Sequence, residues 1–166
     1  MTYDGRAIAN FILDQADAAG MAITPMALQK IVYFCHVWAL IELGQPLVRH
    51  SFEAWEHGPV LQYLYREFKQ FGSDPIRGRA HRISVLTGRD EIVSYEFDAV
   101  TLDLLTRVVA IYGRLSAAVL RELTHARGGP WDKVWYHGAK INPGMRIDNR
   151  DIERFYSRIP LSSRLQ

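Results

Sequence analysis

Hydrophobic residues near the start of the chain recur at helical spacing. Those within residues 8–19 fall on one face of a helix that should end at Gly20. A second helix is predicted to begin at Thr24 and Pro25, because threonine can accept from free backbone amides and proline suits the first helical position. This helix runs towards Gly44 and is apolar around most of its circumference, which predicts a place at the centre of the fold.

The next stretch has a looser pattern. Residues 48–55 alternate roughly between apolar and polar positions and predict an extended segment or an edge strand. Gly58 and Pro59 are predicted to begin a third helix, whose apolar residues continue at helical spacing as far as Gly72.

A β-hairpin is predicted further along the chain. Residues 83–86 and 92–97 have the pattern of short strands, and they flank the turn-forming residues 87–90. The preceding residues 73–82 contain glycine and several basic side chains, and they are predicted to form a loop.

Four further helices are predicted in the second half of the chain. Their start signals are Asp98, Ser116, Pro130 and Asp148. Aspartate and serine cap free backbone amides, and proline fits the first turn of a helix. Pro160 is predicted to end the ordered part.

The pattern as a whole predicts a mostly α fold. We expect a single compact helical domain of about seven helices, with a small β-hairpin or short edge strands. The domain is expected to span residues 1–166, with its core over about residues 5–156, because the sequence has no internal repeat or break in composition.

Composition agrees with an ordinary folded domain. Of the 166 residues, 48% are hydrophobic and 23% are charged, so the chain can bury a core without disulfide or metal staples. The formal net charge is only +2 and no block of like charges is present, which argues against a nucleic-acid binder. The densest basic cluster is interpreted as a solvated linker face and consists of Arg77, Arg79, His81 and Arg82.

The sequence carries no sign of export or membrane insertion. Cys35 is the single cysteine, which excludes an internal disulfide framework and suits a reducing compartment. The first residues lack the charged start and apolar stretch of a secretory signal. The most apolar segment, residues 31–43, is interrupted by His36 and Glu42 and is shorter than the roughly 20 residues of a membrane span. We therefore expect a cytoplasmic protein with no membrane partner.

Titratable residues form no recognisable catalytic or metal-binding pattern. Cys35 and His36 are adjacent in a helix and point about 100° apart, so they are predicted to pack in the core. The histidines lack the helical pairing and the companion cysteines of a zinc site; they stand at positions 36, 50, 57, 81, 125 and 137. Nucleotide, hydrolase and calcium motifs are missing from the sequence. Solvated helix surfaces are expected for the carboxylates Asp14, Asp17 and Glu42. The prediction is no enzymatic activity, no cofactor and no metal.

Tryptophan and tyrosine are numerous for a chain of this size. Trp38 is predicted to fill the core, because it lies in the most apolar helix. Trp55 and Trp131 each stand beside a Gly-Pro break, where the chain turns at the surface, so a role in an interface competes equally with a role in the core.

Several segments stand out by their order and spacing. They are Leu28-Gln29-Lys30-Ile31-Val32-Tyr33-Phe34, Phe52-Glu53-Ala54-Trp55-Glu56-His57-Gly58-Pro59-Val60, Tyr65-Arg66-Glu67-Phe68-Lys69-Gln70-Phe71-Gly72, and then Leu123-Thr124-His125 with Pro130-Trp131. Together they cover nearly the whole chain, and the sequence resembles the Panacea domain family of SocA-like antitoxins and GepA-like phage-associated proteins.

The resemblance implies a function. Members of this family are antitoxins that neutralise a protein toxin, usually encoded next door, by direct binding and without catalysis. SocA-like members can also act as proteolytic adaptors that hand the toxin to the ClpXP protease. The expected partners are therefore a cognate protein toxin and ClpXP.

The candidate partner-binding residues lie in or beside the segments named above. They are Trp55, His57, Gly58, Pro59, Tyr65, His125 and Trp131. If Gly58 and Pro59 begin a helix, Trp55 and His57 lie beside its free amides, and this corner can hold an acidic group of a partner. The alternative is that the corner only locks the loop against the core helix through Trp55 and Tyr33.

The role of His125 and the class of the protein leave further alternatives open. His125 either caps the end of its helix by donating to free carbonyls or faces a partner. A different hypothesis is an enzyme or metal protein that brings together His57, His125 and Cys35. A small DNA-binding regulator is disfavoured by the nearly neutral charge.

Overall fold

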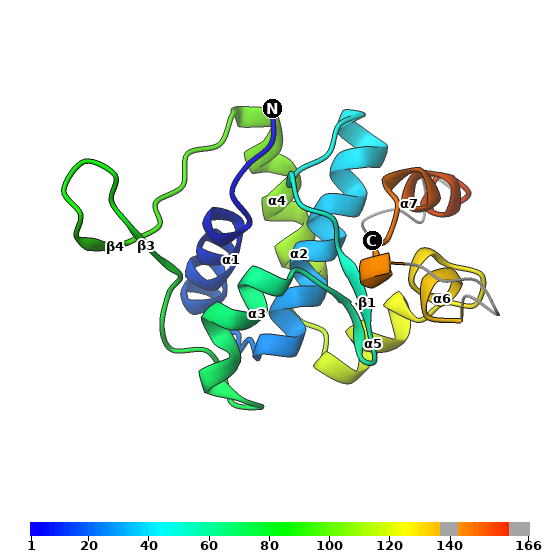
Figure 1. Cartoon of the computed structure of the whole chain (residues 1–166), viewed down its shortest axis with the longest axis horizontal. Coiled ribbons are helices and arrows are strands. Elements are labelled where there is room, and N and C mark those ends of the chain that lie inside the picture. Colours follow the sequence, from blue (N-terminus) through cyan, green and yellow to red (C-terminus); the bar gives the residue numbers. More distant parts are fainter. Residues whose placement is uncertain (137–142, 160–166) are drawn as a thin grey trace.

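The computed structural model describes residues 1–136 and 143–159, and over these residues the protein is mostly helical (Figure 1). The helices of this part are α1 (Gly5–Ala19), α2 (Pro25–Trp38), α3 (Gln62–Phe68), α4 (Ala99–Tyr112), α5 (Ala117–Thr124), α6 (Pro130–Trp135) and α7 (Asn149–Tyr156). Two antiparallel hairpins accompany them: β1 (Glu53–Trp55) with β2 (Gly58–Val60), and β3 (His81–Ile83) with β4 (Asp90–Ile92). The predicted fold class is confirmed. The predicted end at Pro160 lies outside the described residues.

Helix α2 is the centre of the fold, as its apolar sequence predicts. Figure 1 shows it running through the middle of the molecule, with α1 and α3 to one side and α6 and α7 to the other. Every residue from Ala27 to Trp38 is buried. The helix continues as a π-helical turn, η1 (Ala39–Leu43), and ends at Gly44 in the left-handed conformation. By length and composition Pro25–Leu43 resembles a membrane span, but 78% of its most apolar window is buried inside the fold.

The capping signals read from the sequence are present at the helix starts. The side chains of Thr24, Asp98, Ser116 and Asp148 each accept a hydrogen bond from a backbone amide of the first helical turn. Trp38 is in the core as predicted, and its indole nitrogen donates to the hydroxyl of Tyr112 over 2.9 Å.

The expectation of a helix beginning at Gly58 and Pro59 is wrong. These two residues begin strand β2, in which Gly58 pairs with Trp55, and the helix starts only at Gln62. Gly58 has a φ of +119°, which an L side chain rarely adopts and which turns the chain into a hairpin instead of a helix. Tertiary contacts with α2 override the local start signal, because buried side chains of α2 hold the backbone on both sides of the turn into α3.

The second hairpin is confirmed, but its strands begin earlier than expected. The pairing joins His81 to Ile92 and Ile83 to Asp90, so the predicted strand residues 84–86 belong to the connecting loop and the predicted strand residues 93–97 lie beyond the end of β4. The reason lies at the base, where the side chain of Asn10 binds the backbone of Ala80 and of Val93 and so sets where the pairing begins. Figure 1 shows this hairpin projecting from the helical body, and it is called the arm below.

Basic residues of the segment interpreted as a solvated linker face form ion pairs with carboxylates of the same chain. Arg79 contacts the carboxylates of Asp14 and Asp17 on α1. Within the arm, His81 bonds Asp90 and Arg82 pairs with Glu91, both over 2.9 Å. These cations are thus mostly balanced within the chain.

Candidate partner-binding site

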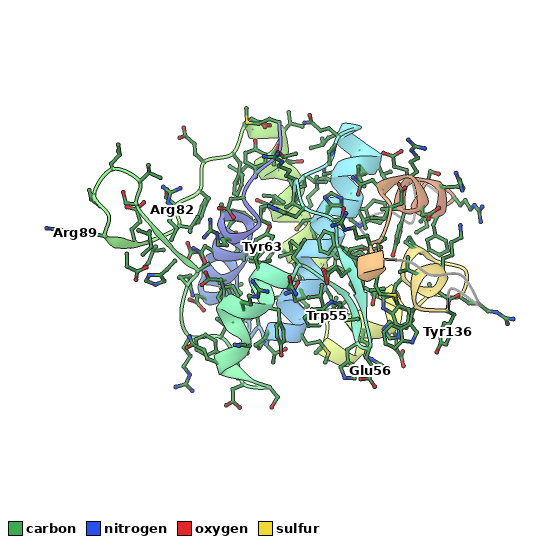
Figure 2. All side chains as sticks on the ribbon, viewed as in Figure 1. Trp55, Glu56, Tyr63, Arg82, Arg89 and Tyr136 are labelled. Atoms are coloured by element: carbon green, nitrogen blue, oxygen red, sulfur yellow. The ribbon has the colours of Figure 1, made fainter. Side chains whose placement is uncertain are left out.

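A pocket of about 410 Å³ lies between the β1–β2 hairpin, the first turns of α2 and helix α3. Its walls are mostly apolar and include Met26, Val60, Leu64 and Phe68. A volume of this size accommodates a large side chain and its neighbour, and it falls within the range of small-ligand pockets. Figure 2 shows Trp55 and Glu56 at the end of the hairpin that borders it.

Three of the predicted site residues line this pocket. Trp55 and Tyr65 meet edge to face, with their ring centroids 4.9 Å apart. The indole nitrogen of Trp55 donates to Glu53 over 3.0 Å, which fixes the ring beside the opening. Tyr65 is 45% exposed and His57 is exposed at the turn of the hairpin. The structure therefore brings two aromatic rings and an imidazole to one opening.

Gly58 and Pro59 lie behind the pocket and are buried. A Cβ on Gly58 would approach Cε of Lys30 to 2.6 Å and Oγ1 of Thr124 to 2.8 Å, so only glycine fits. The carbonyl of Pro59 accepts a hydrogen bond from Nζ of Lys30 over 3.1 Å. These two residues shape the hairpin, and they do not present a surface to a partner.

His125 and Trp131 lie on the opposite side of the same hairpin. Their rings are stacked, with centroids 3.6 Å apart and planes 7° from parallel. The buried indole of Trp131 donates to the carbonyl of Trp55 over 2.7 Å. Trp131, for which the sequence left a core role and an interface role open, is thus buried and holds the hairpin through this hydrogen bond.

Free helix amides do not form the binding corner. The backbone amide of Leu61 already donates to the side chain of Gln29 over 2.9 Å, and the Gln29 amide returns a bond to the Leu61 carbonyl over 3.1 Å. The expected corner with Trp55 and His57 beside these amides is therefore wrong. The alternative, in which the loop is held against the core helix, describes the backbone well. Gln29 and Lys30 make the contacts, however, and not Trp55 with Tyr33, because Tyr33 packs on Phe52.

Lys30 is the site residue that sequence reasoning missed. It lines the pocket, yet only 1% of its surface is exposed. Burial, and to a lesser extent the nearby charge of Arg121, lower the pKa of Lys30 to about 7. The available signal was a Gln-Lys pair inside an otherwise apolar helix, because such polar residues are buried only when the fold requires them.

The electrostatics on the far side of the hairpin are also positive. The pKa of His125 is lowered to about 4, first by burial and then by the charges of Arg121 and Lys30. A hydrogen bond to the backbone of His57 opposes this effect. At neutral pH His125 is therefore an uncharged ring.

Cys35 and His36 belong to the core. Burial raises the pKa of the Cys35 thiol, and the side chain is fully enclosed. The two ring nitrogens of His36 are engaged by the Val48 amide over 3.3 Å and by the Asn149 side chain over 2.8 Å. Cys35 is enclosed in the core whereas His57 is exposed at the hairpin turn, so the structure does not gather Cys35 with His57 and His125. Within residues 1–136 and 143–159, no group of three or more His, Cys, Asp or Glu side chains could hold a metal ion.

The fold and the pocket define a helical domain built around one buried helix and a hairpin locked onto it. The chain belongs to the SocA-like antitoxin family, because the family model described as "Antitoxin SocA-like, Panacea domain" matches residues 28–132. It is also 40% identical over 151 residues to Antitoxin SocA of Caulobacter vibrioides (strain NA1000 / CB15N), a match that covers 90% of this chain and 80% of that protein. No solved structure matches the chain significantly. The resemblance seen in the motifs is confirmed.

Proposed function

We propose that this protein is an antitoxin that neutralises a cognate protein toxin by direct binding, and that the toxin contacts the pocket beside the β1–β2 hairpin. The observation that carries the proposal is the gathering of Trp55, His57 and Tyr65 around one apolar opening. Tryptophan and tyrosine are the side chains that most often anchor protein interfaces. Membership of the SocA-like antitoxin family supports the role of the protein.

The hairpin suits binding because it is held in place before a partner arrives. Gln29 and Lys30 fix its backbone to α2, and Trp131 fixes Trp55 from the other side. A surface that is ordered in advance loses less conformational entropy on association. The exposed residues at its turn can therefore contribute most of their contact energy to affinity.

The proposal extends to an adaptor role in the cytoplasm. In this step the antitoxin delivers the bound toxin to the ClpXP protease, as the family likeness implies. The measurement is the half-life of the toxin in cells with and without ClpX, in the presence of the antitoxin. Equal half-lives would restrict the function to binding alone.

The direct test is co-expression with the product of the neighbouring gene, read out as rescue of growth and as a complex that co-purifies. Trp55→Ala should weaken the complex by about 2 kcal/mol, or roughly 30-fold, as removal of an anchoring tryptophan commonly does. Tyr65→Ala should weaken it about tenfold. Circular dichroism of each variant checks that the fold is kept.

Tyr136→Ala is the matched control. Tyr136 is 71% exposed at the end of α6 and lies apart from the hairpin in Figure 2. Its replacement should change the affinity less than about twofold, as expected for an exposed side chain that makes no interface contact. Absence of any complex with the wild-type protein would overturn the proposed function, and equal losses in all three variants would overturn the assignment to the pocket.

A further inference from the structure

Four basic residues converge around the turn of the β1–β2 hairpin: Lys30 from α2, His57 from the hairpin, and Arg121 and His125 from α5. They are called the basic cluster below. The charge of Arg121 acts on Lys30, and the charges of Arg121, Lys30 and His57 all act on His125. Lys30 and His57 also line the pocket, so the cluster borders an open volume.

The basic cluster lacks a counter-charge. Among the described residues, no carboxylate forms an ion pair with any of its four members. Glu56 and Lys69 are the further charged residues of the pocket wall, and both are exposed to solvent. A buried cation is normally paired, because transfer of a charge out of water is costly. Lys30 is an exception within this fold.

Hydrogen-bond donors in the basic cluster also remain unused. The charged Lys30 side chain has three N–H groups, and one of them donates to the carbonyl of Pro59. Nε2 of His125 and Nε of Arg121 are buried and have no hydrogen-bond partner among the described residues. Neither residue lines the pocket, and Nε2 of the uncharged His125 is an acceptor because its other ring nitrogen donates to the backbone of His57. The buried donors that a ligand in the pocket can reach are therefore those of Lys30.

We propose that the pocket binds an acidic side chain of the partner protein, with the carboxylate meeting the buried ammonium of Lys30 beside His57 and the flanking apolar residues packing on Trp55 and Tyr65. This inference rests on the proposed function and names the chemistry that the partner brings. The apolar walls exclude water around the ion pair, which strengthens it relative to a pair at the surface. A neutral residue at the same place would leave Lys30 unpaired.

The state of Lys30 supports this assignment. With a pKa of about 7, the free protein holds a mixture of ammonium and amine at neutral pH. A carboxylate within contact distance favours the charged form, so binding should be accompanied by proton uptake. The groups that face Lys30 from α5 are Arg121, whose charge opposes that of Lys30, and His125, which is uncharged at neutral pH.

The test compares two blocked peptides, acetyl-Phe-Glu-Leu-amide and acetyl-Phe-Gln-Leu-amide, added to the full-length ¹⁵N-labelled protein. The acidic peptide should bind at least about tenfold more tightly and shift the indole signal of Trp55 and the amide signal of Gly58. Calorimetry at pH 8 in buffers of different ionisation enthalpy should show proton uptake with the acidic peptide only. Equal affinities, or shifts confined to other surfaces, would overturn the proposal.

Lysine variants separate the buried charge from the surface charge. Lys30→Met keeps the aliphatic stem and should abolish the preference for the acidic peptide, whereas Lys69→Met removes an exposed lysine of the same pocket and should retain it. Retention of the preference in Lys30→Met would contradict the assignment. If Lys30→Met does not fold, proton uptake by the wild type alone decides.

A third peptide with a neutral side chain and a free carboxyl end, acetyl-Phe-Gln-Leu, tests the source of the carboxylate. Tighter binding of this peptide than of the acidic one would overturn the side-chain assignment in favour of a chain end. The outcome is independent of the antitoxin role. A preference for the acidic peptide without any toxin complex would remove the proposed function alone, and a toxin complex that is indifferent to Lys30→Met would remove this inference alone.

Discussion

Lys30 joins the core to the surface, because it is almost fully buried between its own helix and the hairpin and yet lines the pocket. A lysine buried without an acidic partner destabilises the folded state in its charged form. The same residue fixes the carbonyl of Pro59. The charged form of Lys30 therefore lowers the free energy of unfolding, and this effect can be measured.

The pH dependence of unfolding should show this cost. The pKa of Lys30 is about 7 in the folded protein against 10.5 for the free side chain, so between these values the unfolded chain binds the proton more strongly. Stability attributable to Lys30 must therefore rise as pH increases from about 7 towards 10.5. Urea unfolding at pH 7 and pH 9.5 should show the wild type gaining stability relative to Lys30→Met. Parallel behaviour of the two proteins, with Lys69→Met as the control, would refute the buried-cation assignment.

Gly58 is a second residue that determines local structure, because it has no side chain. Gly58→Ala should lose about 1–3 kcal/mol from backbone strain at its positive φ, and more from displacement of Lys30 and Thr124. Gly88→Ala is the control, because Gly88 also has a positive φ but no neighbour within 4 Å of its Cβ position. The measurement is the urea midpoint of both variants. Equal losses would show that the close approach at Gly58 contributes nothing.

At the scale of elements, the β1–β2 hairpin is a short structure that depends on α2. Two paired strands of three residues each are not stable alone. This pair is held by the side chains of Gln29 and Lys30 and by the indole of Trp131. The order of α3 depends on the same contacts, because Gln29 binds both backbone groups of Leu61, the residue before its first turn.

Gln29→Ala should therefore loosen the hairpin and α3 together. The substitution leaves the buried amide of Leu61 without its partner and removes one of the two hydrogen bonds to the Leu61 carbonyl, which keeps the bond from the Tyr65 amide; the expected cost is about 1–3 kcal/mol. Hydrogen exchange should show faster exchange at Leu61 and in strand β2, with α1 unchanged. Gln70→Ala, at an exposed position, should leave both the exchange pattern and the stability within about 0.5 kcal/mol of the wild type.

The elements differ in how far the sequence alone predicts them. Helix starts at Thr24, Asp98 and Ser116 follow from local chemistry, because the capping side chain and the amide that it binds are three residues apart. The strand at Gly58 does not, because its cause is Gln29 and Lys30, about thirty residues away in the sequence. The Gly-Pro neighbours of Trp55 predict its place at the surface, whereas Tyr65 is predicted only from the motifs that carry the family resemblance. Lys30 was missed, because burial of a lysine is a property of the assembled fold.

Across the whole molecule, the arm and the pocket are separate features. The arm projects from the helical body in Figure 1, and its loop exposes Val85 fully and Leu86 by 97%. The base of the arm is anchored by Asn10 on α1, so the tip has no part in the core.

Replacement of both tip residues by serine should leave the free energy of unfolding within about 0.5 kcal/mol of the wild type, because neither side chain is buried. Toxin binding should also be unchanged if the pocket is the contact surface. Thermal unfolding and co-purification check the two expectations. A loss of the toxin complex without loss of stability would move the interface to the arm.

The alternation of side chains in β1 has a consequence for how this protein can change over time. Ala54 faces inward, whereas its neighbours Glu53 and Trp55 and the turn residues Glu56 and His57 reach the surface. The positions that fold the hairpin and the positions that meet a partner are therefore different positions. Mutation at the outward set can alter which toxin is recognised while selection on the inward set preserves the scaffold, and a library randomised at these four residues is a natural starting point for redirecting it.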